Sequence, residues 1–173
     1  MNIQLVPFGH QSSYFYNALN VYCQVWGRDY NDSLMFFKGY RRFPNFEGCV
    51  AIVNDYVVGF AFGTRSEYGQ WWHDKVATNV GFRHPALRNA WVLTEIGVLS
   101  EYRNLQIGGM LHDAVIESQP LPNVLLSTQA SNIGARRFYE RRGWTYLHNG
   151  FAFNRGSQPY VVMHRHREHV IAN

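Results

Sequence analysis

The chain passes from a strand into a helix within residues 91–117, which read WVLTEIGVLSEYRNLQIGGMLHDAVIE. Trp91–Leu99 is apolar on both faces, which is typical of a central, buried strand. From Ile107 to Glu117 apolar residues recur three and four positions apart, which predicts an amphipathic helix. The residues between them therefore form a turn that connects a buried strand to the start of a helix.

This turn has the features of an anion-binding site. The start of a helix presents unpaired backbone N–H groups and the positive end of the helix dipole. Gly108 and Gly109 lack a Cβ atom, so a ligand can approach their backbone closely, and Arg103 adds a permanent charge. We expect a cradle for a pyrophosphate group; glycines that serve close packing alone are the alternative. The glycine spacing fits neither a P-loop nor a dinucleotide-binding fingerprint.

The other segments also alternate between strands and helices, which indicates one α/β unit. Asn54-Asp55 joins two apolar runs and favours a tight hairpin turn. Gly27 is expected to end the first helix, and Asn31 and Asp32 to cap the second.

The strand–helix–strand order after residue 90 implies a right-handed βαβ crossover. Residues 64–89 are expected to form an irregular insert with one short helix. The other expected strands are 2–7, 48–53, 56–63, 124–128, 146–153 and 159–164, and the other expected helices are 12–26, 31–44 and 132–142.

Composition narrows the class of protein. The 173 residues carry a net charge of +4, and 46% are hydrophobic against 16% charged, which excludes a disordered chain. No apolar run reaches the ~18 residues of a membrane span, and no signal peptide is visible. Cys23 and Cys49 are too few for a disulfide framework and are expected to be reduced, so the expected compartment is the cytoplasm.

Two blocks of sequence resemble a known family. The run VLSEYRNLQIG at 98–108 is similar to the acetyl-CoA signature [Q/R]-x-x-G-x-[G/A] of the GNAT superfamily of N-acetyltransferases, with Arg103 first, Gly108 last and Gln106 in place of the middle glycine. A later block resembles the N-x-x-A-x-x-F/L-Y-E-x-x-G-F/W pattern of the same family, in the family's order and spacing. Its residues are Asn132, Ala135, Phe138, Tyr139, Glu140, Gly143 and Trp144.

The resemblance implies a GNAT-like α/β fold. Its sheet is mixed, splayed and mostly antiparallel, with about six to seven strands flanked by helices. It further implies a single N-acetyltransferase domain over 1–173, with an acceptor-side half at 1–90 and an acetyl-CoA-binding half at 91–166. Acetyl-CoA is then the co-substrate, and no metal is expected.

The resemblance also implies roles for individual residues. Val98 and Leu99 would offer backbone groups to the pantetheine arm, Asn132 would bond its amide region, and Tyr139 would protonate the departing thiolate. The residues expected around the pyrophosphate are Arg103, Asn104, Gln106, Gly108 and Gly109.

Several of these residues have structural interpretations as well. Tyr139 fits a core position, and Asn132 fits a helix cap. Glu95 lies within an apolar strand, where it is either the general base for an incoming ammonium or the partner of a buried arginine.

The acceptor-binding part is expected within residues 26–40 and 64–90. It offers aromatic and acidic side chains, which suit a small amine: Trp26, Tyr30, Tyr40, Tyr68, Trp71, Trp72, Asp29, Asp32, Glu67 and Asp74. The two adjacent tryptophans equally fit a core cover. His164, His166 and His169 have a spacing that can bind metal, although a histidine-rich tail explains them too. The arginines at 136, 137, 141 and 142 fit a solvated helix face or a phosphate-binding surface.

We therefore expect an N-acetyltransferase that moves an acetyl group from acetyl-CoA to a primary amine of a small molecule, by direct attack in a ternary complex. Its partners are acetyl-CoA and the amine, with neither membrane nor nucleic acid, and it is a monomer or homodimer. The alternatives are a catalytically silent acyl-CoA-binding regulator and an enzyme acting on a protein N-terminus or lysine. A nucleic-acid-binding module is supported by charge alone.

Overall fold

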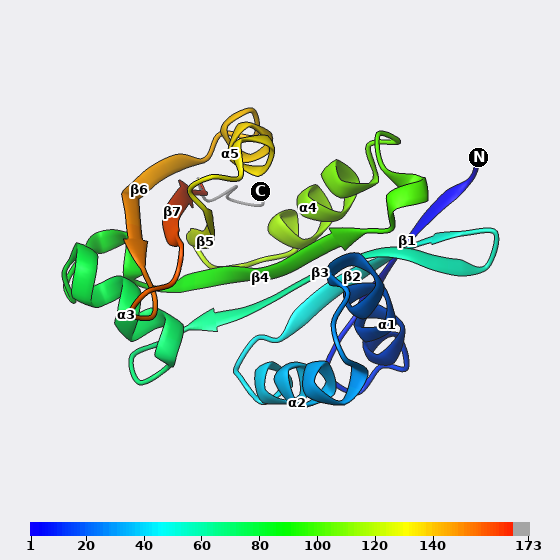
Figure 1. Ribbon diagram of the computed structural model, residues 1–173, viewed down its shortest axis with the longest axis horizontal. Helices are drawn as coiled ribbons and strands as arrows, with labels where there is room; N and C mark the ends of the chain where they lie inside the picture. Colours follow the sequence, from blue (N-terminus) through cyan, green and yellow to red (C-terminus); the bar gives the residue numbers. More distant parts are fainter. Residues whose placement is uncertain (168–173) are drawn as a thin grey trace, which may run out of the picture. The chain divides into compact units, whose positions relative to one another are not determined.

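The structure is a computed structural model that describes residues 1–167 (Figure 1). Its strands form a seven-stranded sheet in the order β1-β2-β3-β4-β5-β7-β6. The strands are β1 (Ile3–Phe8), β2 (Glu47–Val53), β3 (Tyr56–Ser66), β4 (Ala90–Val98), β5 (Asn123–Gln129), β6 (Thr145–Ala152) and β7 (Pro159–His166). The helices are α1 (Tyr14–Trp26), α2 (Tyr30–Arg41), α3 (Trp71–Val80), α4 (Ile107–Glu117) and α5 (Ile133–Glu140). Short 3-10 turns lie at Pro85–Leu87 and Ser100–Tyr102.

The sheet is mixed and mostly antiparallel, which confirms the expected fold class. Strands β4 and β5 are parallel, as the expected βαβ unit requires, and their ladder comprises Ala90–Val92. The pairs β1–β2, β2–β3, β5–β7 and β6–β7 are antiparallel. The chain divides into two compact units, one of Met1–Arg65 with Leu93–Gln119 and the other of Ser66–Val92 with the chain from Pro120 on.

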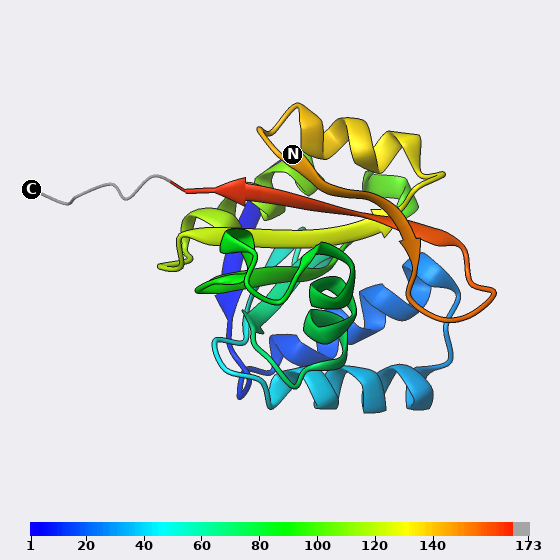
Figure 2. The same ribbon diagram turned by 90° about the vertical axis from the view of Figure 1, so that its left-hand side faces the viewer.

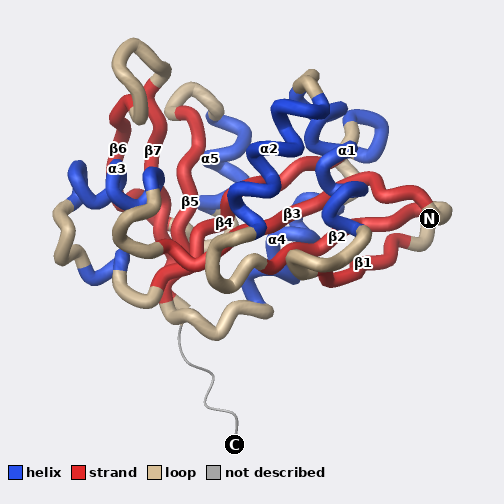
Figure 3. The backbone as a smooth tube through the Cα atoms, turned by 90° about the horizontal axis from the view of Figure 1, so that it is seen from below, coloured by secondary structure: helices blue, strands red, loops and turns tan. Residues whose placement is uncertain are grey.

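In the first unit, β1, β2 and β3 form an antiparallel meander. Asn54 and Asp55 have φ angles of 49° and 66°, as a tight hairpin turn requires, which confirms the turn expected there. Helices α1 and α2 cover one face of these strands and α4 covers the other (Figures 1 and 3). Aromatic and aliphatic side chains form the core; its buried members include Phe8, Phe15, Leu19, Phe37, Phe46, Phe60 and Phe62.

The connection from α1 to α2 is tightly specified. Gly27 ends α1 in the left-handed conformation, with φ 57°, as expected from its lack of a side chain. The cap of α2 is Asp29, whose Oδ1 accepts from the N–H groups of Asn31 and Asp32 at 2.8 and 3.0 Å. The expectation that Asn31 and Asp32 are the caps is therefore wrong: the cap lies two residues before Asn31, and both residues lie in the first turn of the helix.

In the second unit, α3 and α5 lie on opposite sides of the strands β5, β7 and β6 (Figure 2). The segment 64–89 is more regular than expected, because β3 extends to Ser66 and α3 has 10 residues. A hydrogen bond of 2.8 Å between Ser66 Oγ and His73 Nδ1 ties the first turn of α3 to the end of β3. The core beneath α3 includes Val76, Ala77, Leu87, Val92, Leu125, Phe153 and Val162.

Two expectations from composition concern the cysteines and membrane insertion. Cys23 and Cys49 are both free, and burial raises the pKa of the Cys49 thiol to about 11, which keeps it protonated. Among residues 1–167, no helix combines the length and the apolar character that a bilayer span needs.

Candidate active site

The turn after β4 has an unusual backbone. After the short turn at Ser100–Tyr102 the chain adopts positive φ at two residues that are not glycine, Asn104 (63°) and Gln106 (62°). Gln106 is the N-cap of α4, and its side chain does not cap the helix. The first N–H groups of α4 thus remain available as donors for an anion.

The conformation of Gln106 explains the glycine in the family pattern. A residue with a Cβ atom is strained in the left-handed region, and glycine is not. Gln106 adopts the left-handed conformation that glycine favours, and it adds a polar side chain to the turn.

Gly108 and Arg103 lie on either side of this turn. A Cβ atom built on Gly108 would meet only Val98 Cγ2, at 3.9 Å, so the space above this glycine is open. The Arg103 side chain folds back, and its Nε donates to the Val98 carbonyl at 3.3 Å. These features fit a phosphate-bearing ligand at the start of α4.

Leu99 is engaged within the protein. Its N–H donates to the Val58 carbonyl at 2.9 Å, and its carbonyl accepts from the N–H of Tyr102 at 3.0 Å. A pantetheine arm therefore has to share or replace these bonds to use this residue. The backbone roles of Val98 and Leu99 remain predictions.

Glu95 lies three residues before the end of β4, on the face that α1 and α2 cover. Side chains alternate along a strand, so Glu95 and Gly97 share a face. A Cβ atom on Gly97 would lie 2.9 Å from Trp26 Cη2 and 3.1 Å from Phe60 Cε1. The ring of Trp26 thus lies against β4 beside Glu95.

The carboxyl group of Glu95 is poised to titrate near neutral pH. Burial raises its pKa to about 8, and the nearby Arg28 charge acts in the opposite direction. The residue is half-buried, and within residues 1–167 its carboxyl group makes no hydrogen bond or ion pair. The structural alternative, an ion pair with a buried arginine, is not what these residues form.

Tyr22, Trp26 and Tyr40 lie near Glu95, and Phe36 packs against Tyr22 and Tyr40. We call these four side chains from α1 and α2 the aromatic face. Ring centroids are 4.9 Å apart for Tyr22–Trp26, 5.9 Å for Tyr22–Phe36 and 4.8 Å for Phe36–Tyr40. Burial raises the pKa of Tyr40 to about 12, and the charge of Glu95 contributes to this shift. The pKa of Tyr22 is raised by the same two causes.

The sequence indicated Trp26 and Tyr40 as part of the acceptor site, but not Tyr22 or Arg28. Tyr22 lies on the apolar stripe of α1, so its spacing indicated a core residue. Arg28 follows Gly27 in a turn, where a charged residue needs no special explanation. Only the pairing of α1 with the strand that carries Glu95 brings these residues together.

The acidic side chains expected around the acceptor have other roles. Asp29 caps α2, and Asp32 lies within its exposed first turn. In the second unit, Asp74 Oδ1 accepts from the N–H of Gly69 at 3.0 Å. Trp72 donates from Nε1 to Ser127 Oγ at 3.0 Å and packs on the core, as a core cover would, whereas Trp71 is 53% exposed.

Asn132 and Tyr139 belong to the second unit. Asn132 caps α5 through Oδ1, which accepts from the N–H of Ala135 at 3.1 Å, so one of its two expected roles is confirmed. Tyr139 is buried, with its ring 5.9 Å from that of Trp144. Their expected contacts with pantetheine and sulfur remain predictions.

Two of the four arginines at the end of α5 have structural partners. Arg136 donates to the Tyr146 hydroxyl at 2.9 Å and to the Ala130 carbonyl at 2.8 Å. The guanidinium of Arg142 lies 3.9 Å from the ring centroid of Phe138. A phosphate-binding surface on this helix would therefore depend on the exposed Arg137 and Arg141.

Two histidines near the C-terminus, His164 and His166, form hydrogen bonds with the side-chain amide of Asn123. His164 Nε2 and His166 Nδ1 lie 3.0 and 3.2 Å from Asn123 Oδ1, so they share one face of β7 as expected. His169 lies outside the described residues. Across residues 1–167 no group of three or more potential metal ligands is found.

Residues 13–144 match the profile of the acetyltransferase (GNAT) family. The GCN5-like protein acetyltransferase Rv2170 of Mycobacterium tuberculosis is 28% identical over 119 residues, which are 63% of this chain and 58% of that protein. The chain thus matches less than two thirds of that relative's length.

Solved structures share the fold. An acetyltransferase of the GNAT family from Staphylococcus aureus Mu50 is similar with a TM-score of 0.66 and 19% identity, over 95% of this chain and 99% of that one. An aminoglycoside 6'-acetyltransferase type Ii is similar with a TM-score of 0.68 and 19% identity, over 94% and 96%. The chain belongs to the acetyltransferase (GNAT) family, as the two sequence blocks indicated.

Proposed function

We propose that this chain is an N-acetyltransferase that moves an acetyl group from acetyl-CoA to the primary amine of a small molecule. Membership of the family supports the transfer chemistry and the co-substrate. The observation that carries the proposal is Glu95, a half-buried residue on the strand that leads into the anion cradle, whose carboxyl group has its pKa raised to about 8 by burial.

Glu95 meets the requirements of a general base. A primary ammonium has a solution pKa of roughly 10 and must lose a proton before it can attack. A carboxylate with a pKa near the working pH accepts this proton far more readily than one of ordinary acidity. Approach of the ammonium also favours ionisation of Glu95, because opposite charges stabilise each other.

The bond changes follow from this assignment. Glu95 takes one proton from the ammonium, the amine nitrogen forms a bond to the thioester carbonyl carbon, and the carbon–sulfur bond breaks. The nitrogen loses its second proton as the sulfur gains one. The acetamide product leaves, and CoA departs as a thiol once its sulfur has been protonated. No covalent enzyme intermediate is needed, so neither Cys23 nor the inert Cys49 has a role in the step.

The turn after β4 is the proposed pyrophosphate site. The uncapped N–H groups at the start of α4 and the open space above Gly108 suit phosphate oxygens. Arg103 supplies the permanent charge, and the backbone of Asn104 and Gln106 shapes the turn. Asn132 and Tyr139 are assigned to the pantetheine amide and to protonation of sulfur by resemblance to the family.

The test is acetyl-CoA consumption with a panel of polyamines, aminoglycosides, amino acids and peptides. Turnover of a small amine supports the proposal. Turnover confined to peptides assigns the acceptor to a protein N-terminus or lysine. Tight acetyl-CoA binding in calorimetry with no turnover on any acceptor would overturn catalysis and leave a regulator.

A further inference from the structure

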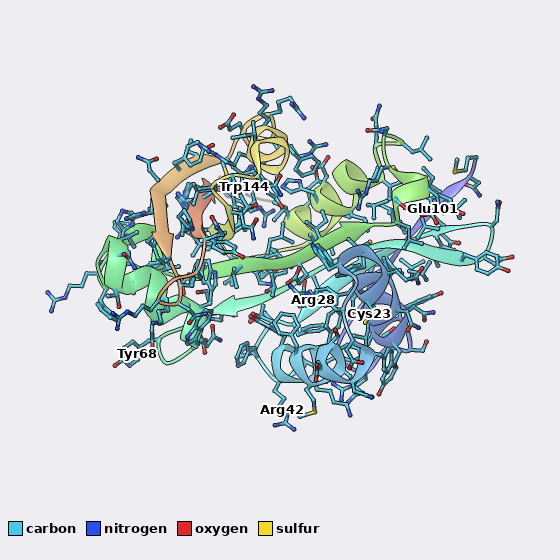
Figure 4. All side chains as sticks on the ribbon, viewed as in Figure 1. Cys23, Arg28, Arg42, Tyr68, Glu101 and Trp144 are labelled. Carbon is cyan, nitrogen blue, oxygen red and sulfur yellow. The ribbon has the colours of Figure 1, made fainter. Side chains whose placement is uncertain are left out.

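Arg28 occupies a fixed position beside the aromatic face. Its backbone lies between two helix termini: its N–H donates to the Cys23 carbonyl at 3.0 Å, and the next residue, Asp29, caps α2. Its side chain is exposed, and within residues 1–167 the guanidinium makes no hydrogen bond or ion pair. In the view of Figure 4, Arg28 lies between the sheet and α2.

The charge of the Arg28 guanidinium affects the proposed base and a tyrosine beside it. Its charge reaches both Glu95 and Tyr22, whose pKa values it draws downward against the effect of burial. Trp26, two residues before Arg28, lies against β4 at Gly97. Arg28 and Glu95 therefore both lie near the part of the aromatic face that holds Tyr22 and Trp26.

Among residues 1–167, Arg28 forms no ion pair with another side chain. Asp29, the acidic neighbour of Arg28, has its Oδ1 committed to the cap of α2. Glu95, with a pKa of about 8, is largely neutral at pH 7. An acceptor with only an ammonium group would favour the ionised form of Glu95 and form an ion pair with it. Arg28 would then still have no anionic partner.

A ligand with both an ammonium and a carboxylate balances both groups. Its ammonium faces Glu95, and its carboxylate pairs with Arg28, whose planar guanidinium matches the two carboxylate oxygens. An apolar or aromatic side chain of the ligand would pack on the exposed rings of Trp26 (41% exposed) and Phe36 (36%).

We propose that the acceptor is an amino-acid-type zwitterion with an apolar or aromatic side chain, and that Arg28 binds its carboxylate. This inference rests on the proposed acetyltransferase function, and it names the class of amine within it. Arg28 then determines specificity, since it contacts the part of the acceptor that does not react.

Matched acceptors and matched variants test the proposal. The acceptors are L-phenylalanine against L-phenylalaninamide and L-leucine against L-leucinamide, which differ in the carboxylate charge. Because the amides have more acidic ammonium groups, kcat/KM is compared per free amine across pH 6–9. The variants are Arg28→Gln, Arg28→Lys and the control Arg42→Gln.

Arg42 is a close control for charge and location. It is exposed and follows the C-terminus of α2, whereas Arg28 precedes the N-terminus of this 12-residue helix. In Figure 4 it lies on the side of α2 away from the sheet. Arg42→Gln therefore removes the same charge from the same pair of helices at the opposite end.

We expect the wild type to prefer the acids by at least roughly tenfold, as a charged hydrogen-bonded pair allows. Arg28→Gln should abolish this preference, mainly through KM; Arg28→Lys should retain part of it, and Arg42→Gln all of it. Equal use of acids and amides by the wild type overturns the proposal. An equal loss on both acceptors in Arg28→Gln also overturns it and reduces Arg28 to a modulator of Glu95.

The acceptor panel separates this proposal from the function beneath it. Turnover of amides, polyamines or aminoglycosides but not of amino acids contradicts the zwitterion and leaves the acetyltransferase intact. Absence of turnover on every acceptor, with acetyl-CoA bound, contradicts the function itself and the acceptor assignment with it.

Discussion

The turn after β4 and the aromatic face are attached to the same strand, but different chemistry builds them. The turn consists mainly of backbone: two residues with positive φ, an uncapped helix start and a glycine with open space above it. The aromatic face consists of side chains from α1 and α2, gathered around a carboxyl group of β4.

This difference sets how each part should respond to substitution. A backbone site tolerates changes of side chain, except where a new Cβ atom fills the space of the ligand. A site made of side chains loses its chemistry when one functional group is removed. Substitutions in the two parts should therefore differ in size and in whether they affect binding or turnover.

The largest effect is expected at Glu95. Glu95→Gln keeps the shape of the side chain but removes the base, so kcat/KM should fall by about 10²–10⁴-fold. Wild-type kcat/KM should rise as the pH rises through about 8, because the ionised carboxylate is the active form. Dividing the wild-type profile by that of Glu95→Gln removes the contribution from ionisation of the acceptor.

Asp55→Asn is the control for loss of one carboxylate, since Asp55 lies exposed in the β2–β3 turn and asparagine tolerates its positive φ. Its activity should match the wild type. A Glu95→Gln enzyme that works at the wild-type rate, or a ratio of profiles that is flat between pH 6 and 9, would assign the base to another group or to water.

A second effect at Glu95 needs no substrate. The unfolded carboxyl group ionises near pH 4.5 and the folded one near 8, so a rise in pH across this interval stabilises the unfolded state alone. The unfolding free energy of the wild type should therefore fall relative to Glu95→Gln by a few kcal/mol, since each pKa unit is worth about 1.4 kcal/mol. Urea unfolding of both proteins at pH 5 and pH 8.5 measures this, and a constant difference contradicts the raised pKa.

The turn allowed much better prediction from sequence than the aromatic face did. Helix α4 has its expected bounds because the apolar period and the preceding turn are both local signals. The surroundings of Glu95 depend on which residues of α1 and α2 meet β4, which no local pattern fixes. The resemblance supplied the expected ligand of the turn, while the roles of Tyr22 and Arg28 became visible only in three dimensions.

Helix α3 shows the same limit on a smaller scale. Adjacent tryptophans and flanking glycines hid its periodicity, and contacts such as Ser66–His73 stabilise it from outside the helix. The prediction of the residue that caps α2 was wrong for a different reason. Asp29, Asn31 and Asp32 are all good capping residues, and the sequence alone did not choose between them.

Gly108→Val should weaken binding rather than folding. The added methyl groups would enter the open space above α4, which we assign to phosphate, so the acetyl-CoA Kd should rise at least roughly tenfold, or about 1.4 kcal/mol. Gly39→Val is the control, because it places the same side chain in an open position on α2. Calorimetry of both variants measures the affinities, and an unchanged Kd for Gly108→Val contradicts the cradle.

Tyr139→Phe tests a residue assigned by resemblance. The substitution keeps the ring that packs near Trp144 and removes the hydroxyl group. Turnover should fall by at least roughly tenfold, at the low end for general acid catalysis because a thiol leaves readily, while acetyl-CoA affinity should barely change. If Tyr139→Phe works at the wild-type rate across pH 6–9, Tyr139 has only a structural role in the core, and water or another residue protonates the sulfur.

The smallest effect is expected at Gln106, where the side chain departs from the family pattern but the backbone does not. Gln106→Gly relieves the left-handed strain at φ 62° and adds chain entropy to the unfolded state, so the net gain in unfolding free energy should be about 0.5–1 kcal/mol. Asn104→Gly should gain less, because asparagine adopts its φ of 63° more readily than glutamine does. If backbone N–H groups hold the pyrophosphate, acetyl-CoA affinity of Gln106→Gly should stay within roughly tenfold of the wild type. A larger loss in calorimetry would make the Gln106 amide itself a ligand group, and the turn would then depend on a side chain as the aromatic face does.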